Sequence, residues 1–158
     1  KEYQQSGDKG SESARRILAK IAVLCSFIKR RKHLALSNYK DYRIPVEELR
    51  SAFRESMQTL ELLDVSHSFY FAETELLDGS EATALYDFFE DVIEAALDSL
   101  RSVNVRISRI GGRRRIAVTL ECEAELSALA RDYPGAELDN DEGEWTCLLT
   151  LGTGGEGR

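Results

Sequence analysis

The sequence predicts an α+β fold, a two-layer sandwich in which helices cover one face of an antiparallel or mixed sheet. Apolar residues recur at helical spacing in long segments, alternate with polar residues in shorter ones, and are separated by turn residues. The expected order of elements is α-α-β-α-β-β-α-β. With 158 residues, of which 42% are hydrophobic, the chain is long enough for one domain and an additional helix.

The first predicted helix runs from about residue 11 to residue 36 and carries a narrow apolar stripe with 4-3-4 spacing. The residues of this stripe are Ile17, Ile21, Leu24 and Ile28. Such spacing is typical of a seam between two helices, and a single helix cannot bury it. We therefore predict a homodimer through this helix, with residues 1–12 as a disordered tail and residues 13–44 as the dimerisation helix and linker.

The following elements are predicted to form one domain over residues 45–151. Pro45 opens a helix over Val46–Leu63, because its fixed φ suits a first helical turn. A strand over residues 65–71 comes next, and Ser80 is expected to cap a third helix.

The C-terminal half is predicted to hold two paired strands, a short helix and a last strand. They cover Val103–Ile110, Arg115–Glu121, Glu123–Arg131 and Glu144–Leu151. Gly111-Gly112 joins the paired strands, because glycines suit the positive φ values of a tight hairpin turn. Residues 152–158 are expected to be a loose tail.

Charge is distributed unevenly along the chain, whose formal net charge is −7. The first 60 residues hold 13 Lys and Arg against 7 Asp and Glu, whereas the remainder holds 8 against 21. The basic run Lys29–Lys32 lacks interleaved aromatic residues, so we expect no nucleic-acid partner. No apolar run is long enough to cross a membrane. Three widely spaced cysteines in apolar segments indicate reduced thiols rather than a zinc site, which predicts a cytoplasmic chain.

Two segments resemble parts of sensor histidine kinases. Arg16–Arg31 looks like the second dimerisation helix of a group of Gram-positive sensor kinases, and Leu85–Leu97 looks like the helix that carries the family's N box. The resemblance covers most of residues 14–151. It implies a histidine-kinase-like ATPase sandwich of the GHKL type behind a dimerisation helix. It also implies two-component signalling, an upstream sensory or membrane segment, and a response regulator as partner.

The chain departs from the family at the residues that hold the metal. The N-box helix of the family presents a Glu and, four residues on, an Asn that holds the Mg²⁺ bridging the ATP phosphates. Matching the helix ends puts Asp91 at the Glu position and Ala95 at the Asn position, and alanine cannot coordinate a metal. Shifting the register by three residues gives Glu94 and Asp98, which could bind Mg²⁺. That shift breaks the ungapped match to the next strand, so we prefer the first register.

A second departure concerns the adenine. The family places an Asp-x-Gly-x-Gly segment after the hairpin, whereas Leu120–Glu125 contains no glycine, and the flexible lid is also absent. Asp141-Glu142-Gly143 is interpreted as a turn. We therefore expect a degenerate domain that binds ATP weakly or not at all, with no metal. The alternative is an active ATP-binding domain that uses Glu94 and Asp98 for Mg²⁺-ATP.

The helix of the N-box resemblance also carries an acidic stripe. Its members are Asp87, Glu90, Asp91, Glu94 and Asp98. We interpret this stripe as a solvated face, with a cation site, a docking surface, or a contact with the basic hairpin Arg113–Arg115 as alternatives. Neither His33 nor His67 has a nucleophile partner that the sequence can place, so no catalytic residue is predicted.

Overall fold

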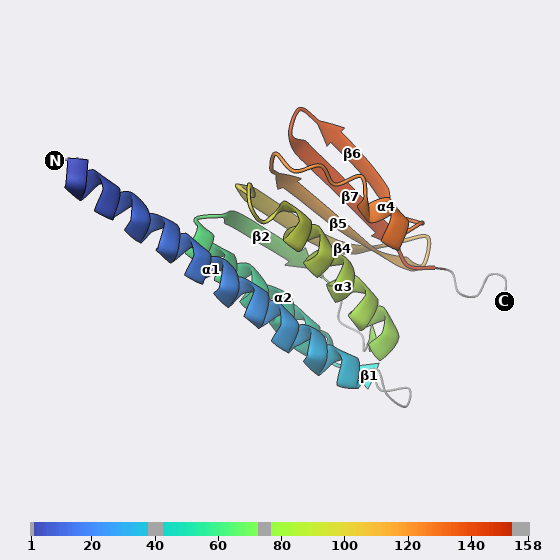
Figure 1. Cartoon of the computed structure of the whole chain (residues 1–158). Helices are drawn as coiled ribbons and strands as arrows, with labels where there is room; N and C mark the ends of the chain where they lie inside the picture. Colours follow the sequence, from blue (N-terminus) through green and yellow to red (C-terminus); the bar gives the residue numbers. More distant parts are fainter. Residues whose placement is uncertain (1, 38–42, 73–76, 153–158) are drawn as a thin grey trace.

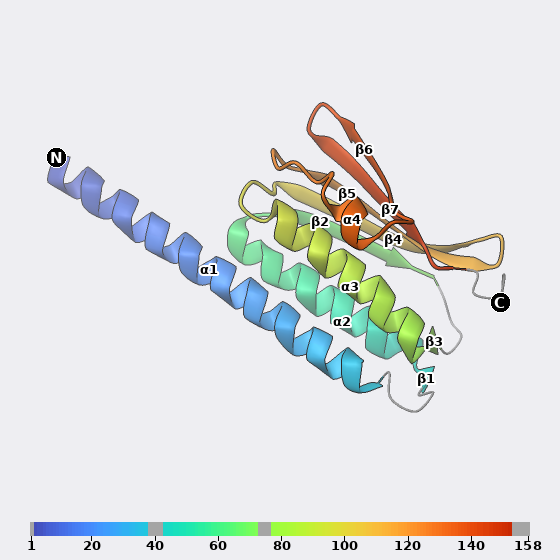
Figure 2. The same cartoon turned by 45° about the vertical axis from the view of Figure 1, so that its right-hand side comes forward.

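Helices cover one face of a five-stranded sheet in the computed structural model of this chain, which describes residues 2–37, 43–72 and 77–152 (Figure 1). For residues 2–9 and 33–37 it describes the backbone alone. The helical layer consists of α1 (Glu2–Ser37), α2 (Val46–Thr59), a 3₁₀ turn (Leu60–Leu63) and α3 (Gly79–Ala96). α1 packs against both α2 and α3, and its N-terminal part projects beyond the sheet (Figure 2).

The sheet is mixed, which is one of the two arrangements that the sequence predicts. Its strand order is β2-β4-β5-β7-β6, in which β2 runs parallel to β4 and the other neighbours are antiparallel. The strands are β2 (Ser66–Phe71), β4 (Ser102–Ile110), β5 (Arg113–Glu121), β6 (Glu137–Asp141) and β7 (Glu144–Thr150). A separate antiparallel pair, β1 (Arg43–Ile44) with β3 (Leu77–Asp78), flanks the helices.

The edge strand β6 was not predicted. Its sequence Glu-Leu-Asp-Asn-Asp has low strand propensity and only one apolar residue. The strand exists because the predicted turn at Asp141-Glu142-Gly143 folds it onto β7. Glu142 and Gly143 both have positive φ (51° and 93°), as a tight hairpin turn requires. The predicted helix before it is reduced to α4 (Leu129–Asp132).

α1 begins at Glu2, so it includes most of the segment predicted as a disordered tail. Gly7 and Gly10 lie inside this helix; each costs about 1 kcal/mol relative to alanine, which weakens a helix without breaking it. The predicted linker residues 38–42 and tail residues 153–158 lie outside the described part of the chain.

The core is shared between α1 and the rest of the fold. Ala19, Val23 and Phe27 are buried at i, i+4, i+8 spacing on α1. The Phe27 ring lies 6.5 Å from the ring of Tyr86 and 5.6 Å from that of Phe89, measured between centroids. The packing therefore continues across the predicted domain boundary at residue 45.

Truncating Phe27 tests this packing. Phe27→Ala should lower the free energy of unfolding by about 3–5 kcal/mol, because it leaves a cavity among buried aromatic rings. Lys29→Ala, at an exposed position on the same helix, should change it by less than about 0.5 kcal/mol. Urea denaturation followed by circular dichroism measures both. If Phe27→Ala were as mild as the control, α1 would not be packed on the domain in solution.

Candidate functional site

α3 carries the carboxylates that the sequence marks as a candidate site, and its position is set locally. Asp78 precedes the helix, and its Oδ1 accepts a hydrogen bond from the Ser80 amide at 3.1 Å. The helix cap is thus Asp78 rather than the predicted Ser80. The apolar side of α3 packs into the core, which turns its acidic side toward α1.

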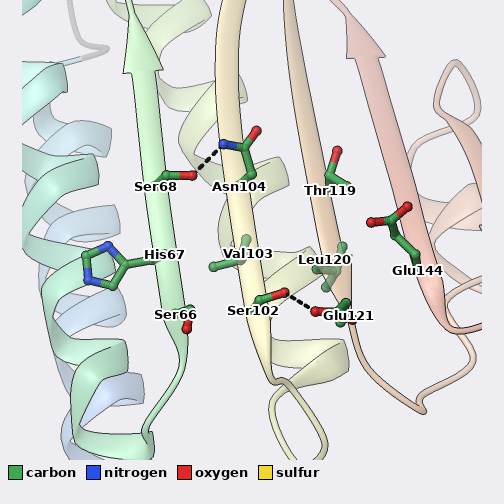
Figure 3. Close-up of a pocket in the computed structure, with 10 residues that line it drawn as sticks. All are labelled: Ser66, His67, Ser68, Ser102, Val103, Asn104, Thr119, Leu120, Glu121 and Glu144. Atoms are coloured by element: carbon green, nitrogen blue, oxygen red, sulfur yellow. Dashed lines mark hydrogen bonds between the residues drawn. The ribbon is translucent and has the colours of Figure 1, made fainter.

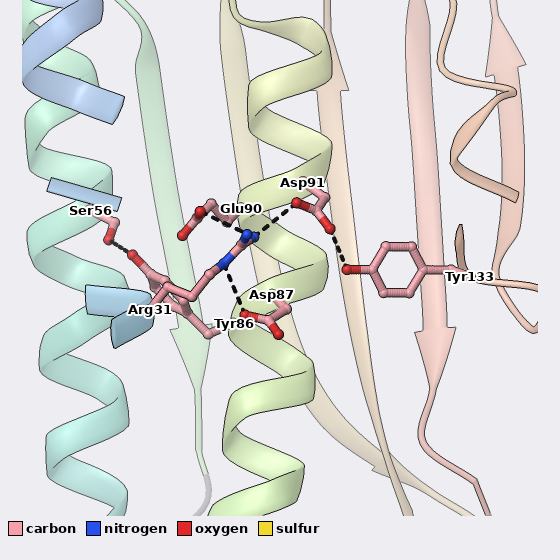
Figure 4. Close-up of polar contacts among 7 residues, drawn as sticks. All are labelled: Arg31, Ser56, Tyr86, Asp87, Glu90, Asp91 and Tyr133. Carbon is pink, nitrogen blue, oxygen red and sulfur yellow. Dashed lines mark hydrogen bonds and ion pairs between the residues drawn. The ribbon is translucent and has the colours of Figure 1, made fainter. Parts of the chain in front are cut away.

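Arg31 of α1 is inserted among three carboxylates of α3 (Figure 4). Its Nη2 lies 2.8 Å from Asp91 Oδ1 and 3.1 Å from Glu90 Oε1, and its Nε lies 3.1 Å from Asp87 Oδ1. The second oxygen of Asp91 accepts a hydrogen bond from the Tyr133 hydroxyl at 2.5 Å. One guanidinium and one phenol therefore bind most of this acidic face.

Two more ion pairs hold α1 against α2 and α3. Lys20 binds the carboxylate of Asp98, and Arg30 binds Glu55 of α2. The prediction that the acidic stripe faces solvent is therefore wrong for Glu90, which is buried, and for its two neighbours that bind Arg31.

The proposed contact between the stripe and the basic hairpin is not what the structure shows. Arg114 of the hairpin binds Glu81, at the N-terminal end of α3, with 2.6 Å between Nη1 and Oε1. The cations that reach the stripe come from α1 instead. Within the stripe, Glu94 remains exposed.

Burial changes the protonation of Glu90. Its side chain is only 1% exposed, and its Oε2 has no hydrogen-bond partner. The pKa of Glu90 is raised from 4.5 to about 7. Desolvation is the largest cause, Arg31 opposes it, and the charges of Glu94, Asp87 and Asp91 act in the same direction as desolvation. Burial also raises the pKa of Asp87, whereas the hydrogen bond from Lys20 lowers the pKa of Asp98.

Two tyrosines join this region as neutral hydrogen-bonding groups. The hydroxyl of Tyr86 lies 2.5 Å from Ser56 Oγ in the interior, and burial raises its pKa. The pKa of Tyr133 is raised by burial and by its bond to Asp91. Tyr133 therefore stays protonated and donates to the carboxylate. The sequence does not mark Tyr133 or Arg31 as a site residue, because neither belongs to a recognisable motif.

The candidate metal ligands are not arranged as a metal site. The oxygens of Asp91 are occupied by Arg31 and Tyr133, and Ala95 is exposed and has no ligand atom. In the alternative register, Asp98 is bound by Lys20, while Glu94 extends into solvent. No group of three or more His, Cys, Asp or Glu side chains in the described ranges is suited to hold a metal. In the preferred register, Asp91 and Ala95 therefore offer no free oxygen to a Mg²⁺-nucleotide complex.

The predicted dimer stripe lies on the side of α1 that faces away from the core. Ile17, Ile21 and Ile28 are between 50 and 63% exposed, and Leu18 beside them is 66% exposed. Leu24 differs from the prediction, because it is partly buried against the protein's own core. The exposed apolar surface, called here the α1 ridge, consists of Ile17, Leu18, Ile21 and Ile28.

The opposite face of the sheet bears a hollow of about 270 Å³ lined mostly by polar side chains (Figure 3). Ser102 Oγ donates to Glu121 at 2.8 Å, and Asn104 Nδ2 donates to Ser68 Oγ at 2.5 Å. His67 points to the helical side, where its Nε2 lies 2.8 Å from Glu61 Oε2. The two hydrogen bonds across the hollow therefore join Ser102 with Glu121 and Asn104 with Ser68, and neither includes His67.

Comparisons with known proteins identify the fold. No protein-family profile and no curated protein matches the sequence. Among solved structures, the histidine kinase domain of the blue-light-activated kinase EL346 of Erythrobacter litoralis is similar with a TM-score of 0.54, at 16% identity over 88% of this chain and 84% of that one. The chain has the fold of a histidine kinase catalytic domain. This confirms the predicted sandwich of histidine-kinase ATPase type.

Two further structures share this histidine-kinase-like fold. A bacterial phosphotransferase has a TM-score of 0.54 at 11% identity, over 87% of this chain and 78% of its own. The histidine kinase AdeS of Acinetobacter baumannii has a TM-score of 0.51 at 9% identity, over 85% and 80%. The described helices of the histidine-kinase-like fold include none that is long and apolar enough to cross a membrane.

The buried carboxylate predicts a dependence of stability on pH. Because the pKa of Glu90 is raised from 4.5 to about 7, the folded chain keeps a proton that the unfolded chain loses. The contribution of protonated Glu90 to stability is therefore complete below pH 4.5 and is lost as the pH rises to 7. Glu90→Gln removes this loss. As the pH rises from about 5 to about 8, the unfolding free energy of the variant should increase relative to that of the parent by on the order of 1–3 kcal/mol.

Urea denaturation at several pH values measures this difference. Glu137→Gln is the matched control, because Glu137 is exposed on β6 and is not among the charges that act on Glu90. The difference between that variant and the parent should not depend on pH. A pH-independent difference for Glu90→Gln would contradict a raised pKa of the buried carboxyl group.

Proposed function

We propose that the chain is the signalling module of a two-component, sensor-kinase-like protein that binds ATP weakly or not at all. It would act through dimerisation and docking of a partner. The observation that carries this proposal is the engagement of the α3 carboxylates by Arg31 and Lys20 of α1. The carboxylate oxygens that a metal–nucleotide complex would need are held by the protein's own cations.

The α1 ridge supports dimerisation. A row of exposed Ile and Leu side chains on a long helix is typical of a surface that another helix covers. The opposite side of α1 already packs on the domain through Val23 and Phe27, so the ridge is left for a second copy. In such a dimer, a change in how the two α1 helices pack on each other would be transmitted to the sheet through α3.

The proposal places this module in the cytosolic part of a larger sensor. An upstream sensory or membrane segment would connect to the N-terminal end of α1, which projects from the body of the domain (Figure 2). A response regulator is the expected partner class, because the fold is shared with histidine kinase domains.

An active ATP-binding domain remains the alternative function. It would use Glu94 and Asp98 as ligands for Mg²⁺-ATP, and the exposure of both side chains supports it. Lys20 would then have to release Asp98. The two proposals differ in the affinity for nucleotide.

A charge in the α1 ridge tests the dimer. The parent chain should be dimeric at about 100 μM, and Ile21→Glu should shift it to monomer, because the dimer would have to bury an unpaired carboxylate. Light scattering coupled to size-exclusion chromatography measures the mass. Leu24→Glu is less informative, since Leu24 also contacts the core.

Ala130→Glu is the control for this experiment. Ala130 is exposed on α4 and lies outside the α1 ridge. The control should stay dimeric. A monomeric parent chain at the same concentration would refute dimerisation through the ridge.

Calorimetry measures the affinity of the chain for Mg²⁺-ATP and so tests the proposed weak nucleotide binding. We expect a dissociation constant no tighter than about 1 mM, which corresponds to about −4 kcal/mol. A micromolar constant that is lost in Glu94→Gln and Asp98→Asn would establish the alternative function. A micromolar constant that survives both changes would refute both the proposal of weak binding and the assignment of Glu94 and Asp98 as metal ligands.

A further inference from the structure

On the outer face of the sheet, the β4–β5 hairpin has a basic half at its turn and an acidic end where β4 begins. Residues 102–120 contain five arginines and no Asp or Glu, and three of them, Arg106, Arg113 and Arg115, lie on this outer face. The far end of the same strands forms a continuous row in the order Ser102, Glu121, Glu144 and Asp141, paired across β4, β5, β7 and β6. From Arg115 to Glu121 the distance along β5 is about 20 Å, since a strand rises about 3.3 Å per residue.

The basic half is a defined surface, called here the arginine face. Arg106, Arg113 and Arg115 share the outer side of the β4–β5 hairpin with Ile110, and Ile110 pairs with Arg113 across the strands. Tyr70 of β2 lies next to Arg106 in the register and is 52% exposed. Arginine and tyrosine side chains are enriched in protein interfaces.

Two of these arginines are held in place. The Arg106 guanidinium lies over the Tyr70 ring, 4.9 Å from its centroid. Arg115 donates from Nε to Thr150 Oγ1 at 3.0 Å. This contact uses the Nε group of Arg115 and leaves its terminal Nη groups for another acceptor. Guanidinium groups that are already oriented lose less entropy when they bind a carboxylate in a bidentate way.

These arginines have no acidic counterpart within the described residues. Arg106, Arg113 and Arg115 form no ion pair there, in contrast to Arg114, which binds Glu81 from the inner side. In a chain with a net charge of −7, a concentration of cations on one open face is unusual. Its charge is complementary to an anionic partner.

We infer that the arginine face docks an acidic segment of a partner protein, about six residues in length. A short acidic peptide covers the basic half and ends before the acidic row. A nucleic acid would continue over the sheet and place its phosphates against Glu121 and Glu144. A membrane attached upstream would lie near the N-terminal end of α1, whereas the β4–β5 turn lies at the opposite end of the molecule (Figure 2).

This inference rests on the proposed function, because it names the surface that performs the partner docking. The failure of this inference can be distinguished from the failure of the proposed function, because the experiments concern different surfaces. Dimerisation depends on α1, and nucleotide binding depends on α3, whereas the docking depends on the outer side of β4 and β5.

Fluorescence anisotropy with a labelled peptide of six glutamates tests the arginine face in the full chain at about 50 mM salt. The parent chain should bind this probe, and Arg106→Gln with Arg115→Gln should weaken binding at least about fivefold. The double variant Arg101→Gln with Arg131→Gln is the matched control. It removes the same charge from exposed positions outside the face and should bind like the parent. Circular dichroism verifies that both double variants are folded.

Two further probes complete the experiment. An oligothymidine of the same charge and vesicles that contain phosphatidylserine should bind more weakly than the glutamate peptide. The inference is overturned if the parent does not bind the peptide, if both double variants lose binding equally, or if the oligonucleotide or the vesicles are preferred.

Discussion

Arg31 determines how the long helix α1 sits on the domain. Its guanidinium contacts three carboxylates of α3, one of which, Glu90, is almost fully buried. Without Arg31 the pKa of Glu90 would rise further, because Arg31 is the group that lowers it. One helical turn before Arg31, Phe27 enters the aromatic core. Together these two contacts set the rotation and the position of α1 along α3.

That rotation decides what each side of α1 can do. The side with Val23, Phe27 and Arg31 is used within the chain, and the α1 ridge remains for another molecule. The same contact uses the Asp91 oxygens that a nucleotide-bound metal would need. The proposed loss of nucleotide binding and the proposed dimer therefore depend on one interaction, even though they concern different surfaces.

The sheet separates two environments. Its inner face is apolar and is covered by the helices, while its outer face is polar and divides into the arginine face and an acidic row. In the row, Glu121, Glu144 and Asp141 are direct cross-strand neighbours of like charge, which is destabilising. Opposite charges at the two ends of one sheet favour a partner that binds in a single orientation.

The sequence by itself determined the local elements. Helical spacing predicted α1, α2 and α3, the pair Gly111-Gly112 predicted the β4–β5 hairpin, and alternation predicted β2, because these signals depend on neighbouring residues. Only the tertiary structure decided which partner each charge meets. Arg31 and Asp91 are 60 residues apart, and no periodicity encodes that contact. The same reason explains β6, whose polar sequence becomes a strand only because β7 is beside it, and Leu24, whose side of α1 depends on where α3 lies.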